Sequence, residues 1–246
     1  MVGRDRARAL WDISHDAVGL VRALCAEMGE PFHSGIIHAD HRARFVGESH
    51  AYVEKLQRDY GHKVIRALDL AEMRELVASD AYFGGSVDEF AGHIHPLNYV
   101  FGLAGLASKA GVRIFEQSRV TGVETAPGPR IRTEKANVRA TFGIFACNGY
   151  IGNLVPKVAA RVMPINNYII ATEPLGPQLQ EALIAGNRAV ADSKFVINYF
   201  RFSQDHRLLF GGTESYRYKF PSDIKAAVRK PMLEIFPQLA DARIAT

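Results

Sequence analysis

Apolar residues recur along this chain with two spacings, one typical of helices and one typical of strands. From the start of the chain an apolar side chain returns every three or four residues until Gly29 and Pro31, which predicts one long amphipathic helix. Its apolar stripe consists of Leu10, Ile13, Ala17, Val21, Leu24 and Met28. A stripe this complete implies that another apolar surface packs against it.

The next part of the chain predicts one strand and three helices. The strand is expected at 34–40, and the helices at 48–60, 70–79 and 97–109. Asp69 and Glu72 have the spacing of a capping box, which marks Asp69 as the residue that caps the second of these helices. Residues 82–95 contain the adjacent Gly84 and Gly85 and little periodicity, so we expect a loop there.

A run of strands is expected after Gly111, at 112–115, 118–125, 130–134 and 141–147. The last of these is apolar or small on both sides, which is typical of a strand buried on both faces of an α/β sheet. Ligands of such sheets gather outside the carboxyl ends of the strands. We therefore expect a cofactor beside Asn148 and Gly149, which follow this strand.

The last third of the chain returns to strands and finishes with a helix. The strands are expected at 168–173, 195–202 and 207–211. Within the second strand, Tyr199 and Arg201 share one face, because side chains alternate with a period of two. Asp223 is expected to cap the final helix, and Pro231 is expected to kink or split it. The order of elements indicates an α/β fold class, with an α+β part carrying these late strands.

Composition and charge exclude several classes of function. The chain has 246 residues, is 48% hydrophobic and carries a formal charge of +4, which is typical of a soluble globular protein. Its basic residues are scattered, so nucleic-acid binding is not expected. No signal peptide or membrane span is expected, and Cys25 and Cys147 suit a reducing compartment, which together predict a cytoplasmic protein.

Histidines provide one alternative chemistry, that of a metal-dependent hydrolase. His93 and His95 alternate along the chain, and His38 lies close to Asp40 and His41. Zinc sites need three or four converging ligands with a defined second shell. The spacing here gives no such convergence, so no metal site is expected.

Four stretches, in this order, carry a resemblance to a known family. They are His95-Pro96 with the helix at 97–109, residues 111–115 with 118–120, residues 146–150, and residues 199–212. Together they resemble the glycine/D-amino-acid oxidase (DAO) family of FAD-dependent oxidoreductases. Within that family, residues 146–150, 162–167, 198–201 and 208–212 together look most similar to the γ-glutamylputrescine oxidoreductase branch. The resemblance covers most of residues 8–243.

The resemblance implies FAD as the cofactor and a small-molecule amine or amino acid as the substrate, whose C–N bond is oxidised. It implies a partial Rossmann-like FAD/NAD(P)-binding domain at 1–30 and 96–153. The other half would be a sheet-based substrate domain at 31–95 and 154–246, so both domains are discontinuous.

The resemblance also implies site residues. The cofactor-binding residues implied are Arg119, Val120, Ala146, Cys147, Asn148 and Gly149, and the substrate-binding residues are Tyr199 and Arg201, with Arg201 facing a substrate carboxylate. No catalytic acid or base is implied.

The chain departs from the family at both ends. Members begin with a strand, a glycine-rich GxGxxG loop and a helix that hold the FAD pyrophosphate, and close with a segment that returns to the flavin. No two glycines of this chain are separated by a single residue. We therefore expect an internal fragment that binds FAD weakly and aggregates when expressed alone. A truncated, non-catalytic remnant or binding module remains an alternative.

Overall fold

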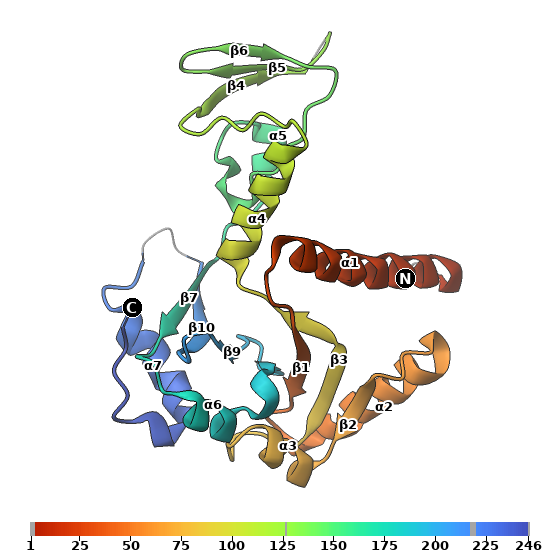
Figure 1. Ribbon diagram of the computed structural model, residues 1–246, viewed down its shortest axis with the longest axis vertical. Helices are drawn as coiled ribbons and strands as arrows, with labels where there is room; N and C mark the ends of the chain where they lie inside the picture. Colours follow the sequence, from red (N-terminus) through yellow and green to blue (C-terminus); the bar gives the residue numbers. More distant parts are fainter. Residues whose placement is uncertain (1–2, 126, 217–219, 246) are drawn as a thin grey trace. The chain divides into compact units, whose positions relative to one another are not determined.

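The computed structural model describes residues 3–125, 127–216 and 220–245 of the chain (Figure 1). Its helices are α1 (Arg4–Met28), α2 (Ala43–Tyr60), α3 (Leu70–Leu76), α4 (Pro96–Lys109), α5 (Pro156–Ala159), α6 (Pro177–Leu183) and α7 (Ile224–Ile235). Its strands are β1 (His33–Ala39), β2 (Ile65–Leu68), β3 (Gly85–His93), β4 (Val120–Glu124), β5 (Arg130–Thr133), β6 (Asn137–Arg139), β7 (Asn166–Ala171), β8 (Ala189–Asp192), β9 (Tyr199–Phe202) and β10 (Leu208–Ser215). The mixture of helices and a mixed sheet confirms the expected α/β class.

Contacts divide the described residues into two compact units. The larger unit contains 3–106, 167–214 and 220–245, and the smaller contains 107–166 with 215–216. The smaller unit is therefore inserted between two parts of the larger one along the chain. In this division α1 and residues 31–95 belong to the same unit. The domains expected from the sequence instead placed residues 1–30 together with 96–153. The assignment of domains to FAD and substrate stays a proposal.

The larger unit is built on a seven-stranded sheet with the order β2-β3-β1-β8-β9-β10-β7. β1 lies between β3, which is antiparallel to it, and β8, which is parallel to it. β9 and β10 form an antiparallel pair. Strands from the first third of the chain and strands from its last third thus form one continuous sheet.

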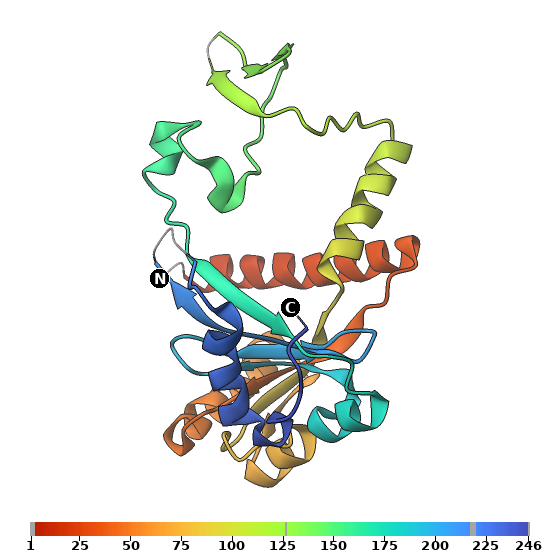
Figure 2. The ribbon, with the colours of Figure 1, turned by 90° about the vertical axis from the view of Figure 1, so that its left-hand side faces the viewer.

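One face of this sheet carries the main core. Ile37 on β1, Val190 on β8, and Phe200 and Phe210 on β9 and β10 are almost fully buried there. Side chains of α3, α6 and α7 pack against them, and Figure 2 shows α3 and α6 on the opposite side of the sheet from α1. Phe200 stacks on Phe210 with ring centroids 5.3 Å apart. The other face of the sheet is only half-buried at its centre.

The helix ends agree with the chemistry of the residues that cap them. Gly29 ends α1 in a left-handed conformation, as C-capping glycines do. The Asp69 side chain accepts from the backbone N–H of Glu72, whose own side chain accepts from the N–H of Asp69, so the predicted capping box is confirmed. Asp223 caps α7 as expected, and that helix continues through Pro231.

The loop expected at 82–95 is wrong, because most of this stretch is β3. Its glycines have a structural reason. A Cβ atom on Gly85 would lie 1.9 Å from the carbonyl oxygen of His38, and one on Gly92 would lie 2.3 Å from that of His33. Glycine at both positions lets β3 approach β1 closely. Glycines that suggested a loop therefore belong to a strand pair.

The stripe that α1 was expected to bury faces outward over its first part. Leu10 and Ile13 are 59 and 64% exposed and Ala17 is exposed as well, whereas Val21, Leu24 and Met28 are half-buried. The helix instead packs through the side that carries Trp11 and the buried Cys25. An aromatic side chain and a small thiol on that side supply a second apolar face, which explains why the prediction chose the wrong one.

The smaller unit contains a three-stranded antiparallel sheet, β4-β5-β6. The strands expected at 118–125 and 130–134 are confirmed as β4 and β5, whereas β6 was not expected and residues 112–115 and 141–147 are not strands. Phe142 and Ile144 are 84 and 92% exposed, so the expected two-face-buried strand is wrong for the described chain. A buried strand needs a neighbour along each edge and a layer on each face. Residues 141–147 pair with no strand among the described residues.

Candidate functional site

β9 directs two polar side chains to the less covered face of the seven-stranded sheet. Phe200 and Phe202 are buried in the core, and Tyr199 and Arg201 alternate with them, so they point to the opposite face. Both are half-buried. The strand expected at 195–202 begins only at Tyr199, but the shared face of Tyr199 and Arg201 agrees with the predicted alternation.

Arg201 is a partly desolvated cation without a carboxylate partner. One guanidinium nitrogen, Nη1, donates to the carbonyl oxygen of Phe202 at 3.1 Å. None of the ion pairs formed among the described residues includes Arg201. Burial lowers the pKa of Arg201 from its usual value, because removal from water disfavours the charged form. A guanidinium in this position is suited to bind a carboxylate ligand.

Tyr199 is held against the sheet by residues of two other strands, β7 and β10. Its hydroxyl donates to Oδ1 of Asn167 on β7 at 2.5 Å. Its ring lies over Gly211 on β10, where an added Cβ atom would come within 2.2 Å of the ring. Burial raises the pKa of Tyr199, so the phenol stays protonated. The hydroxyl and the ring are therefore fixed on the same face as Arg201.

A buried histidine lies near Arg201. His93 on β3 is 8% exposed, and its Nε2 bonds to the carbonyl oxygen of Asn187 at 2.8 Å. Because a carbonyl only accepts, Nε2 carries the proton and Nδ1 is left with a lone pair. Burial, with smaller contributions from the charges of Arg201 and His33, lowers the pKa of His93 to about 4, although the hydrogen bond to Asn187 acts in the opposite direction. His93 is thus neutral at physiological pH.

Two polar atoms in this group lack partners. His33 stacks on His93 with ring centroids 5.0 Å apart, and Nδ2 of Asn187 donates to Nδ1 of His33 at 3.2 Å. Nδ1 of His93 and Oδ1 of Asn187 are both buried and have no hydrogen-bond partner among the described residues. The sequence did not indicate this group, because its members are brought together only by the pairing of β1 with β3 and β8.

The smaller unit contains a cavity of about 630 Å³ that brings predicted cofactor-binding residues together. Arg119 and Val120, at the start of β4, line it. Cys147, which lies after the three strands of this unit in the sequence, lines it as well. Ala146 and Asn148 flank Cys147 in the chain, and a 3-10 helix (Asn148–Ile151) continues the wall. Gly149 is part of that helix. The cavity falls in the size range of small-molecule pockets.

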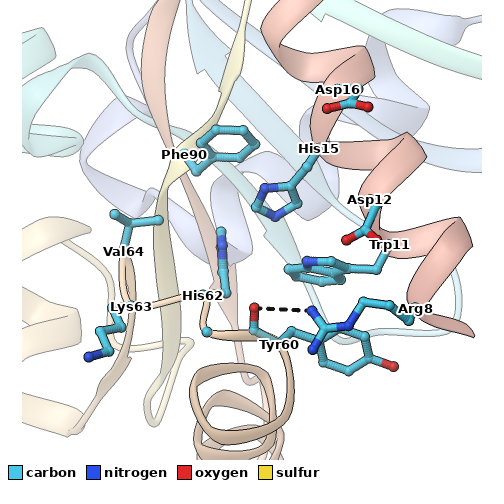
Figure 3. A pocket seen from close by; sticks show the side chains of 11 residues that line it. Arg8, Trp11, Asp12, His15, Asp16, Tyr60, His62, Lys63, Val64 and Phe90 are labelled. Carbon is cyan, nitrogen blue, oxygen red and sulfur yellow. Dashed lines mark hydrogen bonds between the residues drawn. The ribbon is translucent and has the colours of Figure 1, made fainter. Parts of the chain in front are cut away.

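A second cavity, of about 570 Å³, lies where α1 meets the end of α2 and β3 (Figure 3). Five rings contact one another along it; they belong to Trp11, His15, Tyr60, His62 and Phe90. His15 stacks on Phe90 at 4.4 Å, and Nε2 of His62 pairs with Asp88 at 2.9 Å. Arg8 donates to the carbonyl oxygen of Asp59 at 2.6 Å and to that of Tyr60, the bond drawn in Figure 3. These contacts bind α1 to the larger unit.

His93 and His95, two of the histidines that suggested a hydrolase, form hydrogen bonds with the backbone. His93 bonds to a backbone carbonyl, and Nδ1 of His95 accepts from the N–H of Asn98. Within 3–125, 127–216 and 220–245, no three His, Cys, Asp or Glu side chains are arranged to hold a metal ion. Within the same ranges no helix combines the length and apolarity needed to cross a bilayer.

Residues 2–246 match the family model described as FAD dependent oxidoreductase (DAO). The chain is 36% identical over 247 residues to a probable oxidoreductase OrdL of Rhizobium meliloti, which covers 99% of this chain and 57% of that protein. It is 39% identical over 186 residues to the γ-glutamylputrescine oxidoreductase of Escherichia coli, covering 75% of this chain and 44% of that protein. The chain thus spans about half the length of these relatives.

Solved structures share the fold at low identity. The L-proline dehydrogenase of P. horikoshii superimposes with a TM-score of 0.75 at 18% identity, over 94% of this chain and 63% of that one. The glycine oxidase of Geobacillus kaustophilus gives 0.71 at 16% identity, over 98% and 64%. The family match agrees with the expected cofactor, FAD. The chain belongs to the DAO family of FAD-dependent oxidoreductases.

Proposed function

We propose that this chain provides the substrate-facing sheet and part of the FAD-binding surface of an enzyme that oxidises the C–N bond of an amine or amino acid. The observation that carries the proposal is the position of Arg201. Its guanidinium lies half-buried on the less covered sheet face beside Tyr199, with no carboxylate partner among the described residues. A substrate carboxylate would satisfy it.

The energetics favour a carboxylate at this place. A charge-assisted hydrogen bond contributes about 1.5–3 kcal/mol when its donor is already removed from water. Arg201 can offer two parallel N–H groups to one carboxylate, which fixes the orientation of the ligand as well as its affinity. The Tyr199 ring and hydroxyl would then bound the ligand on the side of β7 and β10.

The cavity of the smaller unit fits a role in holding FAD. Arg119, Val120 and Cys147 line it together, and Glu134 adds a carboxylate that can accept a hydrogen bond from a hydroxyl group. Ala146, Asn148 and Gly149 adjoin this wall and allow a cofactor to approach the backbone. FAD, when bound, supplies the acceptor for the hydride of the substrate C–H bond. The residues of this chain bind, orient and shield the reactants.

The finer substrate assignment follows the Escherichia coli relative. γ-Glutamylputrescine carries an amine at one end and an α-carboxylate at the other, so it has both groups that this face would recognise. We propose it as a candidate substrate on the strength of the 39% identity. The free thiols of Cys25 and Cys147 support a cytoplasmic location.

Ligand binding tests this function without requiring turnover. Thermal unfolding of the chain is measured with γ-glutamylputrescine, glycine and proline, and with putrescine, which has no carboxylate. The carboxylate ligands should raise the unfolding temperature of the wild type and of Arg44→Met, an exposed arginine on α2 that serves as the control. Arg201→Met should remove the effect.

Turnover provides the second measurement. With FAD added, dye reduction should accompany oxidation of a carboxylate-bearing amine, and Arg201→Met should raise KM for it by roughly tenfold or more. Equal protection by putrescine and by the carboxylate ligands would remove Arg201 from the site. Ligand binding without any dye reduction would favour the alternative of a non-catalytic binding module.

A further inference from the structure

The side chain of Tyr199 reaches across a neighbouring strand of the sheet. In the strand order of the larger unit, β10 lies between β9, which carries Tyr199, and β7, which carries Asn167 (Figure 1). The Tyr199 hydroxyl nevertheless donates to Oδ1 of Asn167. Because neighbouring strands lie about 4.8 Å apart, the two side chains together bridge about 10 Å of sheet to form this bond.

Gly211 on β10 makes the crossing possible. It pairs with Tyr199 in the ladder between β9 and β10. A Cβ atom at position 211 would lie 2.2 Å from the Tyr199 ring and 2.6 Å from its hydroxyl oxygen. A larger residue would therefore push the phenol away from Asn167. Glycine in a strand interior is explained here by the close approach of a side chain, and the result is a phenol fixed flat over β10.

The bond to Asn167 determines what Tyr199 offers to a ligand. A phenol has one proton to donate and lone pairs that accept. The amide oxygen of Asn167 only accepts, so it takes that proton. Burial raises the pKa of Tyr199, so the hydroxyl does not ionise at neutral pH. Towards the rest of the sheet face, the Tyr199 oxygen therefore acts as an acceptor.

We infer that Asn167 is a positioning residue, which keeps Tyr199 an acceptor for the N–H groups of a bound amine and so makes the site prefer the amine substrate to its carbonyl product. The inference rests on the proposed function, which places the substrate beside Arg201 and Tyr199. The backbone positions of these two residues are about 7 Å apart along one strand, and their side chains share a face. One small carboxylate-bearing amine can contact both.

Oxidation of the C–N bond replaces a donor by an acceptor at this place. The reaction removes a hydride from the substrate carbon and a proton from its nitrogen, and water then replaces the imine nitrogen by a carbonyl oxygen. The amine offers N–H groups to Tyr199, whereas the carbonyl oxygen only accepts. Two acceptors that face each other away from water both lose a hydrogen bond, which disfavours the complex. The phenol that holds the substrate therefore favours release of the product.

Racemic alanine and pyruvate test the inference, because they differ only in the group on the carbon beside the carboxylate. Dissociation constants are measured by NMR titration of the chain. Asn167→Leu removes the acceptor and frees the Tyr199 proton, so pyruvate should bind roughly tenfold more tightly than to the wild type, and alanine no more tightly. Asn167 is exposed, and so is Ile169 on the same face of β7. Ile169→Leu is therefore the control and should change neither constant.

Two further variants show whether Asn167 acts through the phenol. Asn167→Ala also lacks the acceptor and should give the same gain for pyruvate, which a change of side-chain size alone would not give. Tyr199→Phe removes the accepting oxygen, so alanine should bind roughly tenfold more weakly. In the Tyr199→Phe background, Asn167→Leu should no longer change the affinity for pyruvate, because the effect of one residue on the other is then lost.

The possible results separate this inference from the proposed function. An unchanged pyruvate constant in both Asn167 variants would overturn the inference, and so would an equal gain in the Tyr199→Phe background or with Ile169→Leu. The proposed function would survive these results if Arg201→Met still abolished the binding of both ligands. If neither ligand binds to the wild type, the inference and the proposed function fail together.

Discussion

Protonation of His93 should control how the stability of this protein changes between neutral and acidic pH. The folded state holds the pKa of His93 at about 4, mainly because the ring is buried, whereas an unfolded histidine titrates near 6.5. Between these two values the unfolded chain binds a proton that the folded chain does not. Stability is therefore fully present above about pH 6.5 and falls as the pH falls toward 4.

The magnitude follows from the two pKa values. Each unit of difference is worth 1.36 kcal/mol, so the free energy of unfolding should fall by about 3 kcal/mol across this window because of His93 alone. The neighbouring charges of Arg201 and His33 act in the same direction, since each opposes a positive charge on the ring. Other groups titrate in the same range, so the quantity to measure is a difference between variants.

His93→Gln isolates this contribution, because the glutamine amide can donate to the Asn187 carbonyl as Nε2 does but does not titrate. Urea unfolding is measured at several pH values from 7 to 4.5, with His206→Gln as a control for the loss of an imidazole outside this group. The wild type and the control should lose more stability on acidification than His93→Gln does. Parallel curves for all three proteins would refute the reasoning.

Three further changes test single features of the structure. Arg201→Met removes a desolvated charge without breaking an ion pair, so thermal unfolding should show equal or higher stability; a loss above about 1 kcal/mol would assign Arg201 to the fold. Asp69→Ala removes the cap of α3 and should cost about 1 kcal/mol in urea unfolding, whereas an unchanged midpoint would show that the capping box contributes nothing. Asp40 is 1% exposed, and its Oδ2 has no hydrogen-bond partner in the described part of the chain. Asp40→Asn should therefore raise the free energy of unfolding by about 1 kcal/mol, and a decrease would reveal a partner for the carboxylate.

Local sequence chemistry predicted several helix ends well, missed α5 and α6, and predicted the strands less well. Gly29, Asp69 and Asp223 act on their own neighbours, so the helix boundaries that they set could be inferred without the fold. β3 could not be predicted in this way, because Gly85 and Gly92 are explained only by the strand that passes beside them. The segment 141–147 failed for the same reason, since its pattern requires neighbours that the described chain does not place beside it.

The candidate site was only partly visible in the sequence. Tyr199 and Arg201 follow from alternation along one strand. Val120 and Cys147 line the cavity of the smaller unit, and their role in cofactor binding stays a prediction. His93 and Asn187 were missed, because they are 94 residues apart and meet only through the sheet. A pattern of apolar positions carries no signal for a contact of that kind.

The parallel pairing of β1 with β8 also determines when the larger unit can fold during synthesis. His41 and Ser193, at the ends of these strands, hydrogen-bond to each other but are 152 residues apart, with the smaller unit between them. A ribosome that adds about 5–20 residues per second needs roughly 8–30 s to cover that distance. Throughout that interval the nascent chain carries β1 with one edge unpaired, and such edges recruit other strands. The yield of folded protein should therefore depend on translation speed through residues 107–166, and a longer insertion there would prolong the vulnerable period.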